Sequence, residues 1–458
     1  MRTNSLRRRL RVEHLEGRDV PAAVVTALVN GSLFVIGDVN ADTITISQAA
    51  PGQVTISPGA GTTVDGLKVP VTRSFLGNLV IRLGAGNDNL SFDLFRPITL
   101  PGSLVIDYGT MGMGTKTTTT TNAGQFDLRV AGGLGIRYAA GQVTTTLDNL
   151  VVGGNALVVH GAGDSVLTFD NLGGAGQFSS IGRNLTVINT RGMAENNLLD
   201  TNVGGNVTFT NGLARASDNA AGSTTVKNAN NAARATIGGN LVVSNLTGDS
   251  ATGDTVGDVI VRGSVGLFLG SGAFRAAVAD AAVTAAPVSI GGNLIVRGAA
   301  AGEDTVALGA GGTGLKVGQN VSAITGSRNA AITMDDLSVA GNTAVFTGAG
   351  ADTVAIDGAA AAKGSTFGGS FTLSTGPGAD AVTINSGSAS SATTVFNRAV
   401  NVSLGLGDDS LHLATAGKVR FDAPIPLPVV FDGNAGMNTK MVTTGNLVGR
   451  HPTFLHFA

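Results

Sequence analysis

The chain has 458 residues, a formal net charge of −2, 68 glycines and no cysteine. The absence of cysteine excludes a disulfide scaffold, a thiolate metal site and a cysteine nucleophile. The near-neutral charge gives no reason to expect a nucleic-acid partner. No run of 18 apolar residues occurs, so we predict no transmembrane span.

Residues 1–22 form a basic segment whose composition differs from that of the rest of the chain. Four arginines lie between residues 7 and 11, and residues 12–22 read VEHLEGRDVPA. One interpretation is a signal peptide with residues 20–29 as its apolar region, and the alternative is a disordered basic arm. The arginine-rich start and the Leu-Glu-x-Arg sequence resemble the N-terminal LExR-type sorting motif (LEPR-XLL-like) of large secreted and surface proteins of planctomycete bacteria, with Val20-Pro21-Ala22 in place of its leucine pair. That resemblance implies export or sorting to the cell surface.

A short phrase, apolar-Gly-Gly-Asn-apolar, recurs along most of the chain. Full copies lie at residues 152–155, 203–206, 237–240 and 290–293, and looser copies continue the series. With the asparagine as a marker, thirteen copies between residues 78 and 398 have a mean spacing near 27 residues. A repeat of this length made only of strand and turn residues is typical of a solenoid.

The residues after each phrase indicate a strand with one buried face, because apolar and polar residues alternate, as in Phe371-Thr372-Leu373-Ser374. We expect the glycine pair to supply a positive φ at a corner. We expect the asparagines, stacked once per rung, to form an amide ladder. The sequence therefore predicts an all-β fold, a right-handed parallel β-helix (β-solenoid) of about 13 rungs of ~27 residues, with its handedness taken from the general rule for parallel crossovers.

The predicted organisation has four parts, since the ends of a solenoid need caps. They are residues 1–22, an export or sorting segment expected to be disordered; residues 23–72, an N-terminal cap of irregular strands; residues 73–420, the parallel β-helix; and residues 421–458, a C-terminal cap. Three stretches depart from the repeat. They are Thr117–Thr121, predicted as an exposed loop or strand edge; residues 211–236, predicted as a loop that leaves the rod; and the alanine-rich residues 276–286, predicted as a short helical insertion.

A second phrase, Gly-x-Gly-x-Asp, lies between strands at residues 84–88, 348–352, 376–380 and 405–409. It resembles half of the calcium-binding nonapeptide of RTX proteins. That resemblance implies turns placed in tandem, nine residues apart, so that facing turns share each ion. Here Asp352 and Asp380 are 28 residues apart, a full rung, so we do not expect an RTX roll.

If these turns are in register, Asp352, Asp380 and Asp409 stack in one column on adjacent rungs. Carboxylates at strand spacing repel one another, and a hard cation with oxygen ligands, such as calcium, would relieve the repulsion. We therefore treat these three residues as candidate metal ligands and calcium as the candidate cofactor. The alternative is that each Asp accepts hydrogen bonds from its own turn amides and faces water.

Parallel β-helices also carry polysaccharide lyases and glycoside hydrolases, which use clustered carboxylates, Lys or Arg on one face. Here the two members of each adjacent pair, Asp335-Asp336 and Asp408-Asp409, are expected to point to opposite faces of a strand. The five histidines have no metal-ligand spacing. We predict an extracellular or cell-surface, adhesin-like structural β-solenoid without catalytic activity, which binds extracellular-matrix or cell-envelope components or further copies of itself. The alternatives are a carbohydrate-active β-helix enzyme and a calcium-stabilised RTX-like binding protein.

Overall fold

The computed structural model describes residues 22–458, with internal gaps. The residues outside the description are 51, 110–113, 122–125, 172–176, 214–221, 230–233, 247–252, 271, 279–286, 299–301, 310–313, 359–362 and 387–391. The sorting segment predicted at residues 1–22 therefore lies outside the described residues, except for Ala22. So do parts of the loop predicted at residues 211–236, and most of the insertion predicted at residues 276–286.

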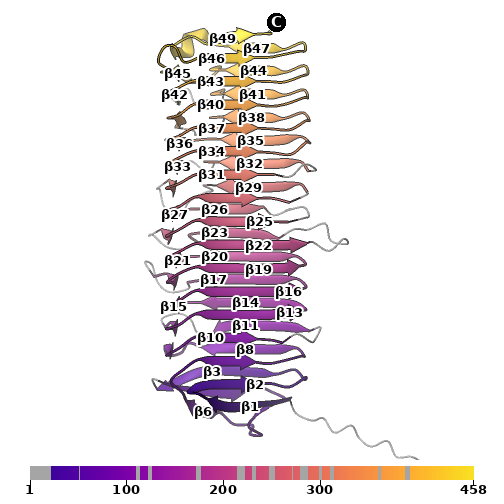
Figure 1. The fold of residues 1–458 in the computed structure, drawn as a ribbon, viewed down its shortest axis with the longest axis vertical. Coiled ribbons are helices and arrows are strands. Elements are labelled where there is room, and N and C mark those ends of the chain that lie inside the picture. Colours follow the sequence, from indigo (N-terminus) through magenta and orange to yellow (C-terminus); the bar gives the residue numbers. More distant parts are fainter. Residues whose placement is uncertain are drawn as a thin grey trace, which may run out of the picture.

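The described strands form a rod of stacked rungs with three strands in each rung (Figure 1). β7 (Leu79–Arg82), β8 (Asp88–Asp93) and β9 (Ile98–Leu100) make the first rung, and the same order recurs up to β48 (Leu447–Gly449). Equivalent strands of successive rungs pair in parallel, which gives three sheets. We call them sheet 1 (containing β7), sheet 2 (containing β8) and sheet 3 (containing β9). Sheet 3 has 14 strands, one for each rung.

Sheet 1 has 18 strands. They are β1 (Ala22–Val29), β2 (Ser32–Ile36), β5 (Thr62–Val64), β7, β10 (Leu104–Asp107), β13 (Leu134–Ala140), β16 (Ala156–Ala162), β19 (Leu185–Arg191), β22 (Val207–Leu213), β25 (Leu241–Asn245), β28 (Val265–Phe268), β31 (Leu294–Arg297), β34 (Val321–Ile324), β37 (Thr343–Phe346), β40 (Phe371–Ser374), β43 (Val400–Ser403), β46 (Val429–Asp432) and β49 (Thr453–Leu455).

Sheet 2 lies beside sheet 1 along the rod. Its strands are β3 (Thr43–Ala50), β4 (Gln53–Pro58), β6 (Val71–Ser74), β8, β11 (Thr115–Thr121), β14 (Gln142–Asp148), β17 (Ser165–Asp170), β20 (Ala194–Leu199), β23 (Ser223–Lys227), β26 (Asp254–Gly257), β29 (Phe274–Val278), β32 (Asp304–Leu308), β35 (Ala330–Met334), β38 (Thr353–Ile356), β41 (Ala381–Ile384), β44 (Ser410–Leu413) and β47 (Thr439–Val442).

Sheet 3 is built from the shortest strands. They are β9, β12 (Leu128–Val130), β15 (Leu150–Val152), β18 (Ser179–Ile181), β21 (Thr201–Val203), β24 (Ala235–Ile237), β27 (Val259–Val261), β30 (Val288–Ile290), β33 (Leu315–Val317), β36 (Leu337–Val339), β39 (Thr366–Phe367), β42 (Thr393–Phe396), β45 (Lys418–Phe421) and β48. A single 3₁₀ turn, η1 (Thr444–Asn446), completes the described elements.

The predicted parallel β-helix is confirmed, with three strands per rung and fourteen rungs in place of about thirteen. The right-handed sense stays a prediction. The described antiparallel pairs, β1–β2, β3–β4 and β4–β6, all lie before residue 75, inside the segment predicted as the N-terminal cap. Parallel pairing continues past residue 420 through β46 to β49. Within the described residues, no helix is long and apolar enough to cross a membrane.

The core runs along the rod axis because inward residues of all three sheets alternate with outward ones. Aliphatic residues fill most of it, and aromatic rings stack from rung to rung near the C-terminal end. The ring centroids of Phe367 and Phe396 are 5.0 Å apart, and those of Phe396 and Phe421 are 5.5 Å apart. In-register pairing thus places like residues on top of one another.

The Gly-Gly-Asn phrase forms the corner between sheet 3 and sheet 1, and its asparagines form the expected ladder. Asn206 Oδ1 accepts the backbone N–H of Asn240 at 2.8 Å, Asn240 Oδ1 accepts that of Ser264 at 2.8 Å, and Asn293 Oδ1 accepts that of Asn320 at 3.0 Å. The bonds join side chain to backbone, in addition to some amide–amide contacts. Each of these corners is thereby hydrogen-bonded to the corner of the next rung.

The reason expected for the glycine pair is wrong. None of the glycines in the four full copies takes a left-handed φ. The constraint is close approach between rungs, since a Cβ at Gly238 would lie 2.2 Å from Gly204 O, and one at Gly204 would lie 2.3 Å from Gly182 O. Glycine is required there because backbone, which has nowhere to move, occupies the side-chain position.

The threonine run at Thr117–Thr121 is neither a loop nor a strand edge. It belongs to β11, a strand inside sheet 2 that pairs with β8 and β14. Thr118 and Thr120 are buried, while Thr117 and Thr119 face outward. Threonine fits here because its β-branched side chain suits a pleated strand and its hydroxyl finds a partner inside.

We expect Gly238→Ala to lower the free energy of unfolding by about 2 kcal/mol or more, because the added methyl group overlaps a backbone oxygen. The matched control is Gly135→Ala in β13, where a Cβ has no neighbour within 4 Å, and its effect should stay within about 0.5 kcal/mol. Chemical unfolding followed by circular dichroism measures both. Equal effects of the two substitutions would contradict the close-approach explanation.

Candidate functional site

The corner where sheet 1 passes into sheet 2 encloses a buried row of carboxylates. Its members precede or begin strands of sheet 2 in two groups, one near each end of the rod, and we call them the Asp column. They are Asp42, Asp88, Asp304, Asp352, Asp380 and Asp409. All are at most 2% exposed. Lys116 and Asn438 occupy the same register position on further rungs.

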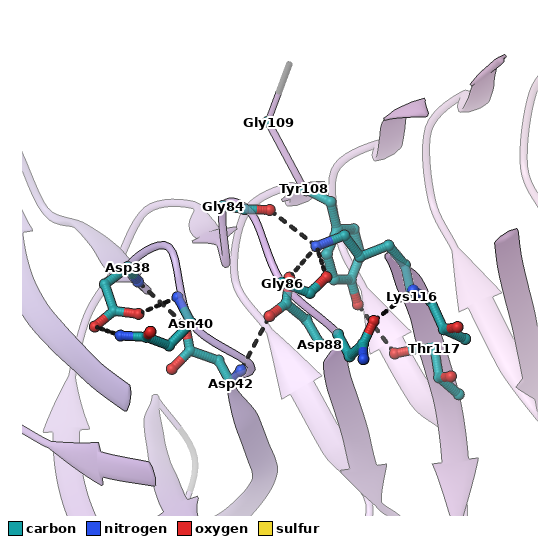
Figure 2. A network of polar contacts seen from close by, with 12 residues as sticks. Asp38, Asn40, Asp42, Gly84, Gly86, Asp88, Tyr108, Gly109, Lys116 and Thr117 are labelled. Carbon is teal, nitrogen blue, oxygen red and sulfur yellow. Dashed lines mark hydrogen bonds and ion pairs between the residues drawn. The ribbon is translucent and has the colours of Figure 1, made fainter. Parts of the chain in front are cut away.

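Near the N-terminal end, a buried ammonium group compensates the Asp88 carboxylate (Figure 2). Lys116 Nζ donates hydrogen bonds to Gly84 O at 3.0 Å and Gly86 O at 2.6 Å, and it forms an ion pair with Asp88 Oδ2. The other Asp88 oxygen accepts the backbone N–H of Asp42 at 3.0 Å. Three oxygens of one Gly-x-Gly-x-Asp turn therefore converge on a single cationic group.

Beside Lys116, two tyrosines continue the polar corner. The rings of Tyr108 and Tyr138 stack at 4.6 Å, and the Thr118 hydroxyl joins their hydroxyls at 2.8 and 2.7 Å. Burial raises the pKa of the Tyr138 hydroxyl to about 12. Both tyrosines are therefore neutral core residues that use their polar ends inside the rod.

The middle of the corner holds an internal amide chain. His160 Nδ1 faces Asn189 Oδ1 at 2.6 Å, Asn189 Nδ2 donates to Asn211 Oδ1 at 2.7 Å, and Asn211 Nδ2 donates to Asn245 Oδ1 at 2.6 Å. Asn245 Nδ2 then donates to Asp254 Oδ2 at 2.9 Å. Burial lowers the pKa of His160 to about 4 and raises that of Asp254 to about 7, so the low dielectric disfavours charge on both groups.

At the C-terminal end, the structure brings together the three residues predicted from the sequence. Asp380 Oδ1 accepts the backbone N–H of Asp352 at 2.9 Å, and Asp409 Oδ1 accepts that of Asp380 at 2.9 Å. Asn438 Oδ1 closes the series by accepting the N–H of Asp409 at 3.0 Å. The predicted stacking is therefore present. The carboxylates point into the rod and bond to the preceding rung, unlike the alternative in which each serves its own turn and faces water.

The second oxygen of each of these carboxyl groups lacks a donor. Oδ2 of Asp352, Asp380 and Asp409 is buried and has no hydrogen-bond partner among the described residues. The hydroxyls of Thr347 and Thr375 interact with Asp352 and Asp380, but each donates its one hydrogen to a carbonyl, Thr375 O or Leu404 O, at 2.6 Å. A carboxylate oxygen without a donor is costly at such burial.

Burial is the main cause of the shifted acidity of these groups. It raises the pKa of Asp380 to about 6, against the lowering effects of the Thr375 hydroxyl and the Asp352 N–H, and the neighbouring carboxylates raise it further. Burial also raises the pKa of Asp352 and of Asp409. A proton or a cation would each stabilise the column.

The arrangement has limited scope for catalysis. Within the described ranges, no group of three or more His, Cys, Asp or Glu side chains is placed to hold a metal by itself. A metal here would need backbone oxygens as well. The carboxyl groups of the Asp column are at most 2% exposed, so a substrate does not contact them in this structure. The sequence did not point to Lys116 or His160. The Gly-x-Gly-x-Asp phrase at residues 84–88 did mark the turn whose oxygens bind the Lys116 ammonium.

No family model matches the sequence, and no curated protein matches it at a significant level. What the rod does is therefore inferred from its own residues.

We expect the His160→Phe variant to lose part of the pH dependence of stability. The folded pKa, about 4, lies below the ordinary value of 6.5, so the unfolded chain binds the proton first and stability falls as pH drops from about 7 towards 4. At about pH 5 this costs the wild type about 2 kcal/mol relative to neutral pH. Urea unfolding at both pH values measures the difference. His412→Phe, on the outer face of sheet 2, is the control, and an unchanged pH slope in His160→Phe would contradict the assignment.

Lys116→Met should lower the free energy of unfolding by about 3–5 kcal/mol in EDTA, because it leaves the Asp88 carboxylate buried without its counter-charge. The double variant Asp88→Asn/Lys116→Met removes both charges and should recover much of the loss. Chemical unfolding of the two variants and the wild type tests this. A single variant as stable as the double variant would show that the ion pair does not compensate Asp88.

Proposed function

We propose that the chain is an extracellular or cell-surface structural rod, adhesin-like in its mode of action and without catalytic activity. The observation that carries this proposal is the division of polar groups between inside and outside. The Asp column and the internal amide chain are buried and used in rung-to-rung bonding. The outward side of sheet 2 instead includes threonines in register, with Thr117 beside Thr144 and Thr119 beside Thr146.

A long, regular outer face suits repeated weak contacts with a polymer or an envelope layer better than it suits a reaction centre. Fourteen rungs at about 4.8 Å per rung span roughly 65 Å. Contacts repeated along such a length add through effective concentration. Cell-envelope or matrix components, or further copies of the chain, are the proposed partners. The sorting motif predicted at residues 1–22 supports the location.

One observation favours the second candidate, a carbohydrate-active β-helix enzyme. Arg82, Asp107 and Arg137 lie in register on the outward side of three successive strands of sheet 1. Such a charged triplet fits an anionic polysaccharide. It contains one carboxylate, whereas glycoside hydrolysis uses two, so a lyase-type activity is the form that it supports.

Location is tested by expressing the full chain with a C-terminal epitope in a planctomycete host. Labelling of the epitope on intact cells by a membrane-impermeant reagent is expected. The matched control changes Leu15, Glu16 and Arg18 to alanine, which should abolish labelling. Equal amounts of both proteins inside the cell would contradict the proposed surface location.

Catalysis is tested separately by incubating the purified chain with a panel of anionic and neutral polysaccharides and measuring unsaturated products and reducing ends. The structural proposal predicts binding without turnover, and the charged triplet predicts weaker binding of anionic polysaccharides by Arg82→Ala. Turnover that is lost in Asp107→Asn would overturn the proposal in favour of the enzyme.

A further inference from the structure

A groove runs along the outer side of the rod where four successive strands of sheet 1 end. The strands are β25, β28, β31 and β34, which lie on neighbouring rungs in the C-terminal half of the rod (Figure 1). The groove has a volume of about 630 Å³, which falls within the range of roughly 300–1,000 Å³ typical of ligand sites. Because its lining residues come from successive rungs, the groove extends along the rod, as a chain-like ligand requires.

An aromatic ring forms one wall of this groove. Phe268 lies on the outward side of β28, and its ring covers the backbone of Gly266, where a Cβ would meet the ring carbon Cε2 at 2.7 Å. The glycine therefore gives the ring room to lie against the strand. Phe268 remains 37% exposed. An aromatic face held in this way can pack on the apolar face of another ring.

A cationic side chain lies beside this ring. Arg297 on β31 is the register partner of Phe268, so the two side chains leave adjacent strands on the same side of sheet 1. Arg297 is exposed, and none of the ion pairs between described residues includes it. No Asp or Glu occurs among the described residues that line the groove. Asp304 accepts the Gly326 N–H at 2.8 Å, but it belongs to the Asp column on the inner side of the corner. The guanidinium group thus offers its donors to an anion from outside the chain.

The groove also contains a buried hydroxyl group that lacks the partner found on neighbouring rungs. Thr325 lines the groove and is 6% exposed. The equivalent threonines of the next two rungs, Thr347 and Thr375, each donate a hydrogen bond to a carbonyl oxygen of the following rung. Thr325 Oγ1 has no hydrogen-bond partner within the described part of the chain. A ligand hydroxyl at this position would supply the missing hydrogen bond.

Apolar side chains continue the strip on both sides of the arginine. Ile324 and Phe346 follow Arg297 at the same register position on β34 and β37, and Phe346 is exposed. Two aromatic side chains thus stand three strands apart, roughly 14 Å at about 4.8 Å per strand, with the guanidinium group between them. The strip is open rather than divided into pockets, which suits the broad faces of sugar rings better than it suits peptide side chains.

We propose that this groove binds an anionic polysaccharide, with one sugar ring on Phe268 and a uronic-acid carboxylate paired with Arg297. Phe346 extends the contact to a further sugar, and the Thr325 hydroxyl bonds to a sugar hydroxyl at the groove floor. The inference rests on the proposed function, since it assigns a place and a polymer to the contacts that the rod makes along its side. The charged triplet on β7, β10 and β13 occupies the same register position further along the rod, so one long polymer chain can contact both.

The test is isothermal titration calorimetry of the full chain, in EDTA, with a tetrasaccharide of galacturonic acid. The fully methyl-esterified tetrasaccharide is the comparison ligand, because it keeps the sugar rings and lacks the charges. We expect tighter binding of the acid form. Arg297→Gln should weaken binding of the acid about tenfold or more, as the loss of a charge-assisted hydrogen bond predicts, and should leave binding of the ester unchanged. Arg262→Gln removes the same charge from an exposed position at the corner between sheets 3 and 1, and should bind as the wild type does.

Phe268→Leu separates a lost ring contact from a folding defect, because it keeps an apolar side chain over Gly266. It should weaken binding of both the acid and the ester at an unchanged thermal midpoint. Unchanged binding in Arg297→Gln and Phe268→Leu, or absence of tetrasaccharide binding by the wild type, would overturn the inference. Equal binding of a poly-glutamate peptide of the same charge would also contradict it, since the groove would then accept any polyanion. Failure of the proposed function is read separately, from absent labelling of the epitope on intact cells.

Discussion

The structure depends on one constraint, the spacing of about 4.8 Å between hydrogen-bonded strands of successive rungs. Because the rungs pair in parallel and in register, every residue sits directly above its counterpart from the previous rung. A corner must then accept backbone packed on backbone, and this restricts it to glycine where a carbonyl of the preceding rung points at the Cα, as at Gly204 and Gly238. The same stacking lets one asparagine side chain bond to the next rung, so a short phrase repeated many times builds a continuous ladder.

Stacking also concentrates charge, and the rod compensates it in three ways. Lys116 neutralises Asp88 at the N-terminal end. In the middle of the polar corner, neutral amides and a histidine whose pKa is held low by burial avoid charge altogether. Towards the C-terminal end, backbone N–H groups serve one oxygen of each Asp and leave the other without a donor. A single structural feature, the corner between sheets 1 and 2, thus ranges from an ion-paired carboxylate, Asp88, to carboxylates with one donor-less oxygen along its length.

The fold was predictable because turn and core residues recur with a fixed period, which reports directly on rung length. The number of strands per rung was not, since the three-residue strands of sheet 3, such as Val259–Val261, are too short to show periodicity. A loop or a strand edge was predicted for the threonines of β11 because the partners of their buried hydroxyls lie outside the strand, as Tyr108 does for Thr118. The stacking of Asp352, Asp380 and Asp409 was predictable from spacing. Their inward orientation and the role of Lys116 depend on register across rungs, which no local pattern contains.

The register itself is the central claim, and the absence of cysteine makes it directly measurable. Thr353 and Ala381 are register partners with outward side chains on adjacent strands β38 and β41. Oxidation of the Thr353→Cys/Ala381→Cys double variant is predicted to give a rapid, complete disulfide, because paired strands bring the Cα atoms within bridging range. The offset pair Thr353→Cys/Thr383→Cys is predicted to remain reduced under the same conditions. Preferential bridging of the offset pair would show a different register, and would remove the Asp column from the position on which this account rests.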